Sequence, residues 1–318
     1  MSDESREGRH LIATVDVKAL VSAAGERQVR ALAKLISQIE DGSAQLPEIM
    51  RSLKPRGAMI VGLTGSPGVG KSTLTSALIS AYRAQGLSIG VLAIDPSSPF
   101  TQGAVLGDRI RMQDHFLDDH VFIRSMATRG HLGGLAAATP QAIRLLDHAG
   151  FDVILVETVG VGQSEVEIVS HADTTLVVLA PGMGDSIQAV KAGLLEIGDI
   201  YVINKADRDG AEVTSRELRH ALALVPQEPE REIILTSADR GTGVTELTAA
   251  IDRHHQYLQQ SGALLQRQVQ RASLEIEHLT AAALRQKIRA GRLTELANEV
   301  AAGKMDAYSA ADELLKGI

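Results

Sequence analysis

The chain has 318 residues, of which 44% are hydrophobic, so it is long enough to bury a sizeable core. Its net charge of -7 and pI near 5.8 argue against nucleic acid or an anionic membrane as the main partner, because no general positive field attracts either. Cysteine is absent, which excludes disulfides and thiolate chemistry and fits a reducing compartment, so we expect a cytoplasmic protein.

The N-terminal part of the chain is predicted to be helical. Its first residues, MSDESREGRH, are polar and lack the apolar core of a signal peptide, and no later run is apolar enough to span a membrane. Further along, apolar residues recur at helical spacing at Val29, Leu32, Leu35, Ile36 and Ile39. DGSAQLPEIMRSL then indicates a turn and a second short helix starting at Pro47. We assign residues 1–54 to a helical N-terminal extension.

The middle of the chain, residues 55–258, is predicted to be one α/β domain. Short β-branched runs alternate here with helical stretches, and the runs are AMIVGLT, IGVLAID, VFIRS, DVILVET, TTLVVLA, DIYVINK and REIILTS. Such alternation predicts a mainly parallel central sheet flanked by helices. Ligands of these folds bind at the carboxyl ends of the strands, and polar, glycine-containing segments follow the predicted strand ends here.

A phosphate-binding loop follows the first predicted strand. GSPGVGKS fits the pattern G-x-x-x-x-G-K-[ST] between a strand and a helix, which makes a chance glycine loop a poor alternative. The glycines let backbone N–H groups turn toward phosphate oxygens, Lys71 can reach the β- and γ-phosphates, and the Ser72 hydroxyl can ligate Mg²⁺. The predicted loop residues are Gly65, Ser66, Pro67, Gly68, Val69, Gly70, Lys71 and Ser72.

The next segment, AIDPSSPFTQGAVLGDRIRM, contains two carboxylates. Asp95 closes the second predicted strand, and Asp108 lies in the loop beyond it. Both are candidates for the Mg²⁺ environment or for positioning an attacking water. An alternative for Asp108 is a simple ion pair with Arg109 or Arg111.

The stretch ILVETVGVGQSE presents a glutamate where most GTP-binding switch proteins have an aspartate. Glu157 ends a strand expected beside the phosphate-loop strand, so its carboxylate can approach Mg²⁺ bound by Ser72, directly or through water. Gly160 lets its N–H sense a γ-phosphate, which predicts a switch over residues 161–167. A helix N-cap is the alternative role for Glu157. Because Val161 follows Gly160 where a glutamine would orient water, we expect slow unassisted hydrolysis.

A base-reading element, NKAD, follows a later strand. The Asp207 carboxylate can accept two hydrogen bonds from N1–H and the exocyclic amine of guanine, a pairing that adenine cannot make. Asn204 is expected to tie this loop to the phosphate loop, and Lys205 to lay its stem along the base. Ser237 and Ala238, after the last strand, would bring a backbone N–H near guanine O6. A solvated surface turn is the alternative interpretation of NKAD.

The C-terminal region, residues 259–318, is predicted to be helical. Apolar residues alternate there at steps of four and three, at Leu265, Val269, Ala272, Ile276, Leu279 and Ala283. This narrow seam packs helix against helix, and two interpretations stay open: a helix folded back on its own domain, or a dimerisation arm. Elsewhere, the ten histidines show no metal-ligand spacing, and His131 in the glycine-rich SMATRGHLGGLA is expected to be structural.

Taken in order, GSPGVGKST, AIDPSSPFTQGAVLGDRIRM, SMATRGHLGGLA, VETVGVGQSE and NKAD resemble the MeaB/ArgK family of G proteins, bacterial relatives of the human methylmalonic aciduria type A protein. The resemblance covers approximately residues 15–318. It implies a P-loop NTPase fold with a helical N-terminal extension and a C-terminal dimerisation arm. It also carries the phosphate loop on to Thr73, the magnesium and hydrolysis carboxylates onto Asp95, Asp108 and Glu157, and base recognition onto Asn204, Lys205 and Asp207.

The resemblance implies a homodimeric GTPase chaperone of an adenosylcobalamin-dependent acyl-CoA mutase, usually methylmalonyl-CoA mutase. Such a protein uses GTP, GDP and Mg²⁺, and gates cofactor loading and protects or reactivates the mutase. The segment PGMGDSIQAVKAG, with Gln188 and Lys191, is then a further switch that responds to the mutase. We expect no cobalamin ligand on this chain.

Three other functions fit the sequence less well. A protein kinase would need an acceptor site and ATP, which NKAD disfavours. A nickel-insertion GTPase is disfavoured because the chain has no cysteine. A structural dimer without turnover is disfavoured by the intact Lys71, Ser72 and Glu157.

Overall fold

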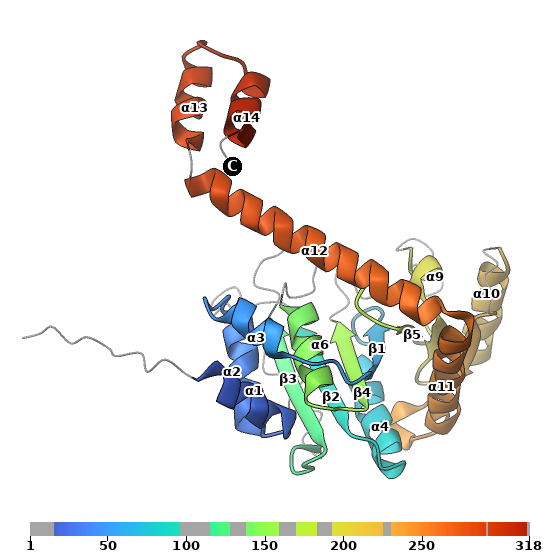
Figure 1. Cartoon of the computed structure of the whole chain (residues 1–318). Helices are drawn as coiled ribbons and strands as arrows, with labels where there is room; N and C mark the ends of the chain where they lie inside the picture. The colour runs from blue at the N-terminus through green and yellow to red at the C-terminus, as the bar shows by residue number, and fades with distance from the viewer. Residues whose placement is uncertain are drawn as a thin grey trace, which may run out of the picture. The chain divides into compact units, whose positions relative to one another are not determined.

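The computed structural model describes residues 16–95, 115–127, 138–158, 170–182, 193–224, 230–290 and 292–316. The described residues divide into two compact units, one up to Gln260 and one from Ser261 onward. Both are labelled by element in Figure 1.

The first unit is built on a parallel sheet of seven strands. The strands are β1 (Met59–Thr64), β2 (Ile89–Asp95), β3 (Val121–Ala127), β4 (Val153–Thr158), β5 (Thr174–Leu179), β6 (Ile200–Ile203) and β7 (Glu232–Leu235). Their order is β3-β2-β4-β1-β5-β6-β7, and every pairing is parallel. All seven predicted strands are present, so the predicted α/β fold is confirmed. The carboxyl ends of β1, β4 and β5 therefore meet at the centre of one sheet edge.

Strand side chains alternate between two cores because successive residues of a strand point to opposite faces. On one face, Leu63 of β1 and Leu155 of β4 pack with α4 (Lys71–Ala84) and α11 (Val244–Ser261). On the other, Ile154 of β4 packs with α6 (Thr139–His148), and Val177 of β5 with α9 (Leu194–Ile197) and α10 (Ala211–Ala223). Burial on both faces explains why the strands read as nearly continuous apolar runs.

The N-terminal extension forms three helices, α1 (Val17–Gly25), α2 (Val29–Glu40) and α3 (Leu46–Ser52). The sequence predicted the second and, within one residue, the start of the third, but not α1. The α1 side chains Val17, Val21 and Ala24 are buried in the same core as α2 and α6. The Asp16 carboxylate caps α1 by accepting from the backbone N–H groups of Lys18 and Ala19. The extension is thus part of the first unit's core.

The second unit is helical throughout its described residues. It consists of α12 (Ala263–Ala290), α13 (Leu293–Ala301) and α14 (Ala307–Lys316). Arg292, just before α13, pairs with Glu295 at 2.8 Å and with Glu313 of α14 at 2.8 Å, which links the last two helices. Five of the six predicted seam residues on α12 are exposed: Leu265, Val269, Ile276, Leu279 and Ala283.

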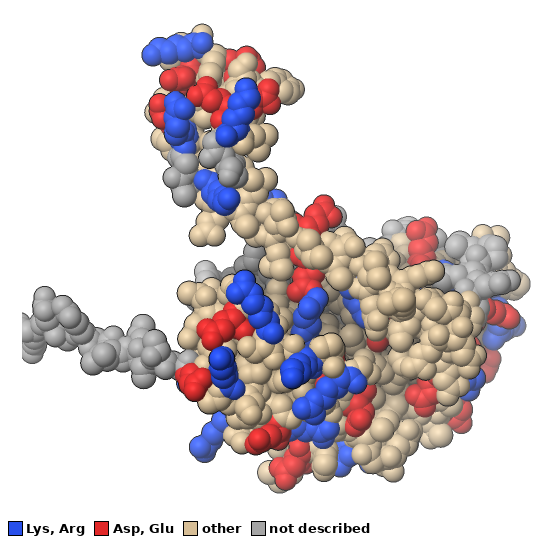
Figure 2. Space-filling view, viewed as in Figure 1, with Lys and Arg blue, Asp and Glu red and all other residues tan. Residues whose placement is uncertain are grey.

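The surface shows no dominant sign of charge on the face drawn in Figure 2, where blue and red side chains are interspersed. In the part of the chain that the structure describes, none of the helices combines the length and the apolar character that crossing a bilayer requires.

Candidate nucleotide-binding site

The loop between β1 and α4 has a backbone that only glycine adopts readily. Gly65, Gly68 and Gly70 have φ values of 139°, 83° and 95°. A Cβ on Gly65 would lie 2.1 Å from the Val178 carbonyl oxygen, and one on Gly70 would lie 2.5 Å from Asn204 Nδ2. Backbone conformation therefore favours glycine at all three positions, and close approach of β5 and of the base-reading loop also requires it at Gly65 and Gly70.

Lys71 begins α4 and lies over this loop. Its buried ammonium donates to the Gly65 carbonyl at 2.6 Å and to the Ser66 carbonyl at 3.1 Å. The positive charge is thereby held at the N-terminal end of a helix, where the peptide dipoles also favour an anion. Pro67 is exposed and Val69 is buried, so the tip of the loop faces outward while its base is anchored in the core.

Glu157 and Ser72 are brought together by the strand pairing. β4 lies beside β1 with Glu157 opposite Leu63, and the Ser72 hydroxyl donates to Glu157 Oε1 at 2.6 Å. The other carboxylate oxygen, Oε2, accepts from the Thr75 hydroxyl at 2.9 Å. Glu157 is buried, as is Ser72. A hydroxyl and a carboxylate beside a phosphate loop are the hard oxygen donors that Mg²⁺ prefers, so these residues fit that ion.

The remaining predicted acidic and switch residues are only partly covered by the structure. In the sheet register Ala93 of β2 lies opposite Glu157, so the backbone of Asp95 reaches the same edge two residues further on. Asp108, Gly160 and the predicted switch over residues 161–167 lie outside the described residues, as do His131 and residues 183–192 of the second switch segment, including Gln188 and Lys191.

Asn204 links the base-reading loop to the phosphate loop, as expected. Its side-chain amide donates to the Val69 carbonyl at 2.9 Å. Its Oδ1 accepts from the Thr236 hydroxyl at 3.2 Å and from the Ala238 N–H at 3.1 Å. That backbone N–H, predicted to face guanine O6, is therefore already directed at Asn204 in this structure.

Lys205 connects the same two loops from the outside. The backbone of Lys205 has a φ of 56°, which is uncommon for a residue other than glycine. The Lys205 ammonium donates to the Gly68 carbonyl at 2.5 Å. The stem of Lys205 consequently runs from the NKAD loop to the tip of the phosphate loop. A flat apolar stem in this place can cover one face of a base.

Asp207 lies among hydrogen-bond donors. Its Oδ1 accepts from the Ser237 hydroxyl at 3.1 Å, and its Oδ2 pairs with Arg240 at 3.0 Å. The Ser237 hydrogen bond and, to a smaller extent, the Arg240 charge lower the pKa of Asp207 below its ordinary value. The carboxylate is ionised at neutral pH and can accept two hydrogen bonds from a base edge.

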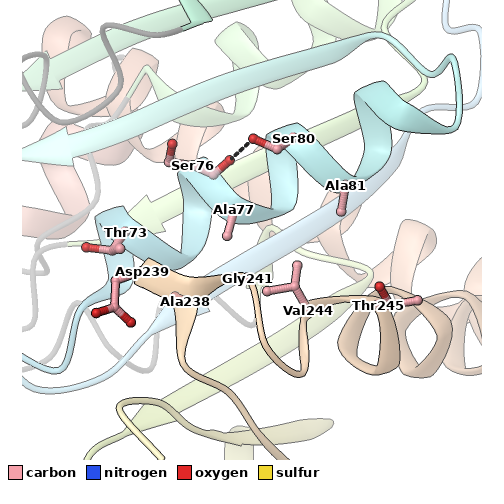
Figure 3. A pocket seen from close by; sticks show the side chains of 10 residues that line it. All are labelled: Thr73, Ser76, Ala77, Ser80, Ala81, Ala238, Asp239, Gly241, Val244 and Thr245. Atoms are coloured by element: carbon pink, nitrogen blue, oxygen red, sulfur yellow. Dashed lines mark hydrogen bonds between the residues drawn. The ribbon is translucent and has the colours of Figure 1, made fainter. Parts of the chain in front are cut away.

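Thr73, the residue after the phosphate-loop motif, lines a pocket of about 520 Å³. It lies between α4 and the turn formed by η3 (Ala238–Arg240) and the start of α11 (Figure 3). Thr73 and Asp239 lie toward the same end of it in this view, while Ser80 and Ala81 line it further along α4. Two predicted nucleotide residues, Thr73 and Ala238, thus line one pocket.

Two residues of this region were not predicted from the sequence. Thr75 follows Ser72 by three residues, and this spacing indicates that the two side chains lie on the same face of a helix. Arg240 follows Ser237 by three residues in a short turn, and the sequence offered no signal that it pairs with Asp207.

Comparison with known proteins identifies the family and the fold of this chain. The family model for the methylmalonyl Co-A mutase-associated GTPase MeaB matches residues 30–292. A putative GTPase of Pyrococcus abyssi is 49% identical over 301 residues, covering 91% of this chain and 93% of that protein. The mouse mitochondrial methylmalonic aciduria type A homolog is 39% identical over 66% of this chain and 52% of its own length. A solved structure described as LAO/AO transport system kinase shares the fold, with a TM-score of 0.67, 24% identity, and 96% and 98% of the two chains covered.

Proposed function

Because this chain belongs to the MeaB family of methylmalonyl-CoA mutase-associated GTPases, we propose that it binds GTP with Mg²⁺ at the central sheet edge and hydrolyses it to GDP and phosphate. The observation that carries the proposal is the convergence of Lys71, Ser72 and Glu157 at the carboxyl ends of β1 and β4. The NKAD loop, tied to the phosphate loop by Asn204 and Lys205, supplies the base-reading carboxylate Asp207.

Each group has a separate task in this reaction. The backbone N–H groups of residues 65–73 and the Lys71 ammonium bind the phosphates and stabilise the charge that develops as water attacks the γ-phosphorus. Ser72 and Glu157 hold Mg²⁺, which when bound neutralises phosphate charge. Asp95, Asp108 and the Gly160 N–H are proposed to assist at the γ-phosphate end, and Asp207, with Ser237 and Ala238, to select guanine.

The nucleoside is proposed to lie between Lys205 and the pocket end at Thr73 and Asp239. In this proposal the base meets Asp207, and the sugar hydroxyls face Asp239, which lines the pocket. Ser237 and Arg240 each contact one oxygen of the Asp207 carboxylate, which leaves an acceptor site on each oxygen for the two guanine donors.

The proposed role of GTP turnover is to gate adenosylcobalamin loading and the protection or reactivation of an acyl-CoA mutase, with methylmalonyl-CoA mutase as the expected partner. The family description and the name of the mouse relative support this assignment. A partner that contacts the GTP-bound and GDP-bound states differently changes the rate at which one state becomes the other, or the affinity of the protein for each nucleotide. Mutase-stimulated hydrolysis is therefore expected.

The proposal is tested by measuring phosphate release from GTP and from ATP by the purified protein, alone and with each acyl-CoA mutase from the same genome. We expect slow GTP turnover that needs Mg²⁺, acceleration by one mutase, and no turnover by a Lys71→Ala variant. A preference for ATP would contradict the base assignment, and no acceleration by any mutase would contradict the chaperone role.

A further inference from the structure

We infer that Thr75 is a positioning residue for Glu157. It sets the orientation of the Glu157 carboxylate toward the Mg²⁺ ion that binds the phosphates. This inference rests on the proposed function, because it assigns the Ser72 and Glu157 pair to a magnesium nucleotide. Thr75 lies outside the phosphate-loop motif, whose last residue in the G-x-x-x-x-G-K-[ST] pattern is Ser72.

The geometry gives the two oxygens of Glu157 different partners. Oε1 accepts from Ser72 at 2.6 Å, and Oε2 accepts from Thr75 at 2.9 Å. Ser72 and Thr75 are three residues apart on α4 and therefore share the helix face that lies against β4. The carboxylate is thus held at both oxygens by hydroxyls of one helix.

The two hydroxyls differ in what a nucleotide can do to them. Ser72 is the residue that gives a lone pair to Mg²⁺, so its hydroxyl serves both the ion and Oε1, and its position follows the ion. Thr75 is fully buried one turn further along the helix, away from the phosphate loop. Its bond to Oε2 can persist through the nucleotide cycle and keep Oε1 directed at the phosphate end.

Thr75 also has an alternative acceptor that fixes its side chain. Its hydroxyl lies 3.0 Å from the Lys71 carbonyl, the usual i−4 partner of a helical threonine. A single proton serves both acceptors, and a carboxylate accepts more strongly than a neutral carbonyl. The β-branched side chain therefore stays in one rotamer with its hydroxyl between Lys71 and Glu157.

Groups that orient a metal ligand typically change metal affinity about 10–100-fold when they are removed. Thr75→Val keeps the shape of the side chain and removes the hydroxyl, whereas Thr75→Ser keeps the hydroxyl. Thr214→Val is the matched control, because the Thr214 hydroxyl makes the same i−4 bond, to Gly210 at 3.1 Å, on α10.

The experiment measures GDP affinity by calorimetry with excess EDTA and across a Mg²⁺ titration, together with GTP turnover. For Thr75→Val we expect unchanged GDP affinity in EDTA, a half-saturating Mg²⁺ concentration raised about tenfold, and a lower kcat with little change in KM. Thr75→Ser and Thr214→Val should behave like the unmodified protein.

The inference is overturned if Thr75→Val has an unchanged Mg²⁺ dependence, including the case in which only its thermal stability falls. It is also overturned if Thr75→Ser fails to restore the Mg²⁺ dependence. Failure of the proposed function is seen separately, because the unmodified protein would then show no Mg²⁺-dependent binding or turnover, and both proposals would fall together.

Discussion

At the scale of single residues, Asp207 is the side chain on which base selection depends. Replacing it by asparagine puts an amide donor where guanine also offers a donor, so we expect GTP affinity to fall at least about 100-fold. Xanthine carries a carbonyl at that place, so XTP should become the better substrate. Competition binding with GTP and XTP measures this. Asp209→Asn, a change of the nearby exposed carboxylate, is the control, and equal losses in both variants would contradict the assignment.

A second residue-scale prediction concerns pH. Asp118 accepts from Arg83 at 2.7 Å, and this hydrogen bond, with smaller help from the His120 N–H, lowers the pKa of Asp118. A carboxyl with a lowered folded-state pKa stabilises the fold above its unfolded pKa, and that stability is lost as pH falls through the folded value. Arg83→Met should therefore cost at most ~1 kcal/mol at pH 7, and its deficit should shrink below about pH 4.

Urea unfolding of both proteins at several pH values measures this difference. Arg83 also donates to the Leu87 carbonyl, which does not titrate, so only the pH-dependent part of the deficit reports on Asp118. A deficit that stays constant with pH would show that Asp118 contributes nothing through Arg83.

At the scale of elements, helix α2 is predicted to be essential to the first unit rather than an appendage. Leu35 is fully buried in a core shared by the N-terminal helices, α6 and the sheet. Leu35→Ala should lower the free energy of unfolding by about 2–5 kcal/mol, because a buried cavity is left behind. Urea denaturation checks this, with Lys34→Ala on the exposed side of the same helix as the control. Similar midpoints for the two variants would show that the extension is loosely attached.

The elements differ in how far the sequence could predict them. Strands buried on both faces read as apolar runs, so all seven were found, and their order put Glu157 beside the phosphate loop. Helix α1 was missed because the stretch is short, although Val17, Leu20, Val21 and Ala24 follow helical spacing. Contacts such as Thr75 with Glu157 or Arg240 with Asp207 depend on rotamers and turn geometry, which a pattern of residue types does not determine.

At the scale of the whole molecule, the arrangement ties three loops into one site through buried polar contacts. Asn204 joins the phosphate loop, the NKAD loop and the turn at Ala238, and its amide is satisfied on both its donor and acceptor sides. Removing the Asn204 side chain would leave its partners on two other segments, Val69 in one and Thr236 and Ala238 in the other, without their hydrogen bonds. The base-reading and phosphate-binding parts can therefore be expected to respond to the nucleotide together.

The last prediction concerns self-association through α12. Leu265 and Ile276 are each 64% exposed, and Val269 and Leu279 extend the same seam, so a long apolar stripe faces solvent. A second copy is the occupant we propose, because a seam with alternating steps of four and three packs best against an equal helix. Light scattering should then give twice the chain mass, and Val269→Glu or Ile276→Glu should shift the protein to monomers at micromolar concentration.

Gln270→Glu adds the same charge on α12 off the seam and should leave the dimer intact. If the seam instead packs on its own chain, the unmodified protein will be monomeric, and Val269→Glu will lower its stability without changing its mass. A charge buried at a dimer interface lowers the molar mass measured by light scattering, whereas a charge buried within one chain lowers its unfolding midpoint. The two measurements together therefore decide between a dimerisation arm and a helix folded back on its own domain.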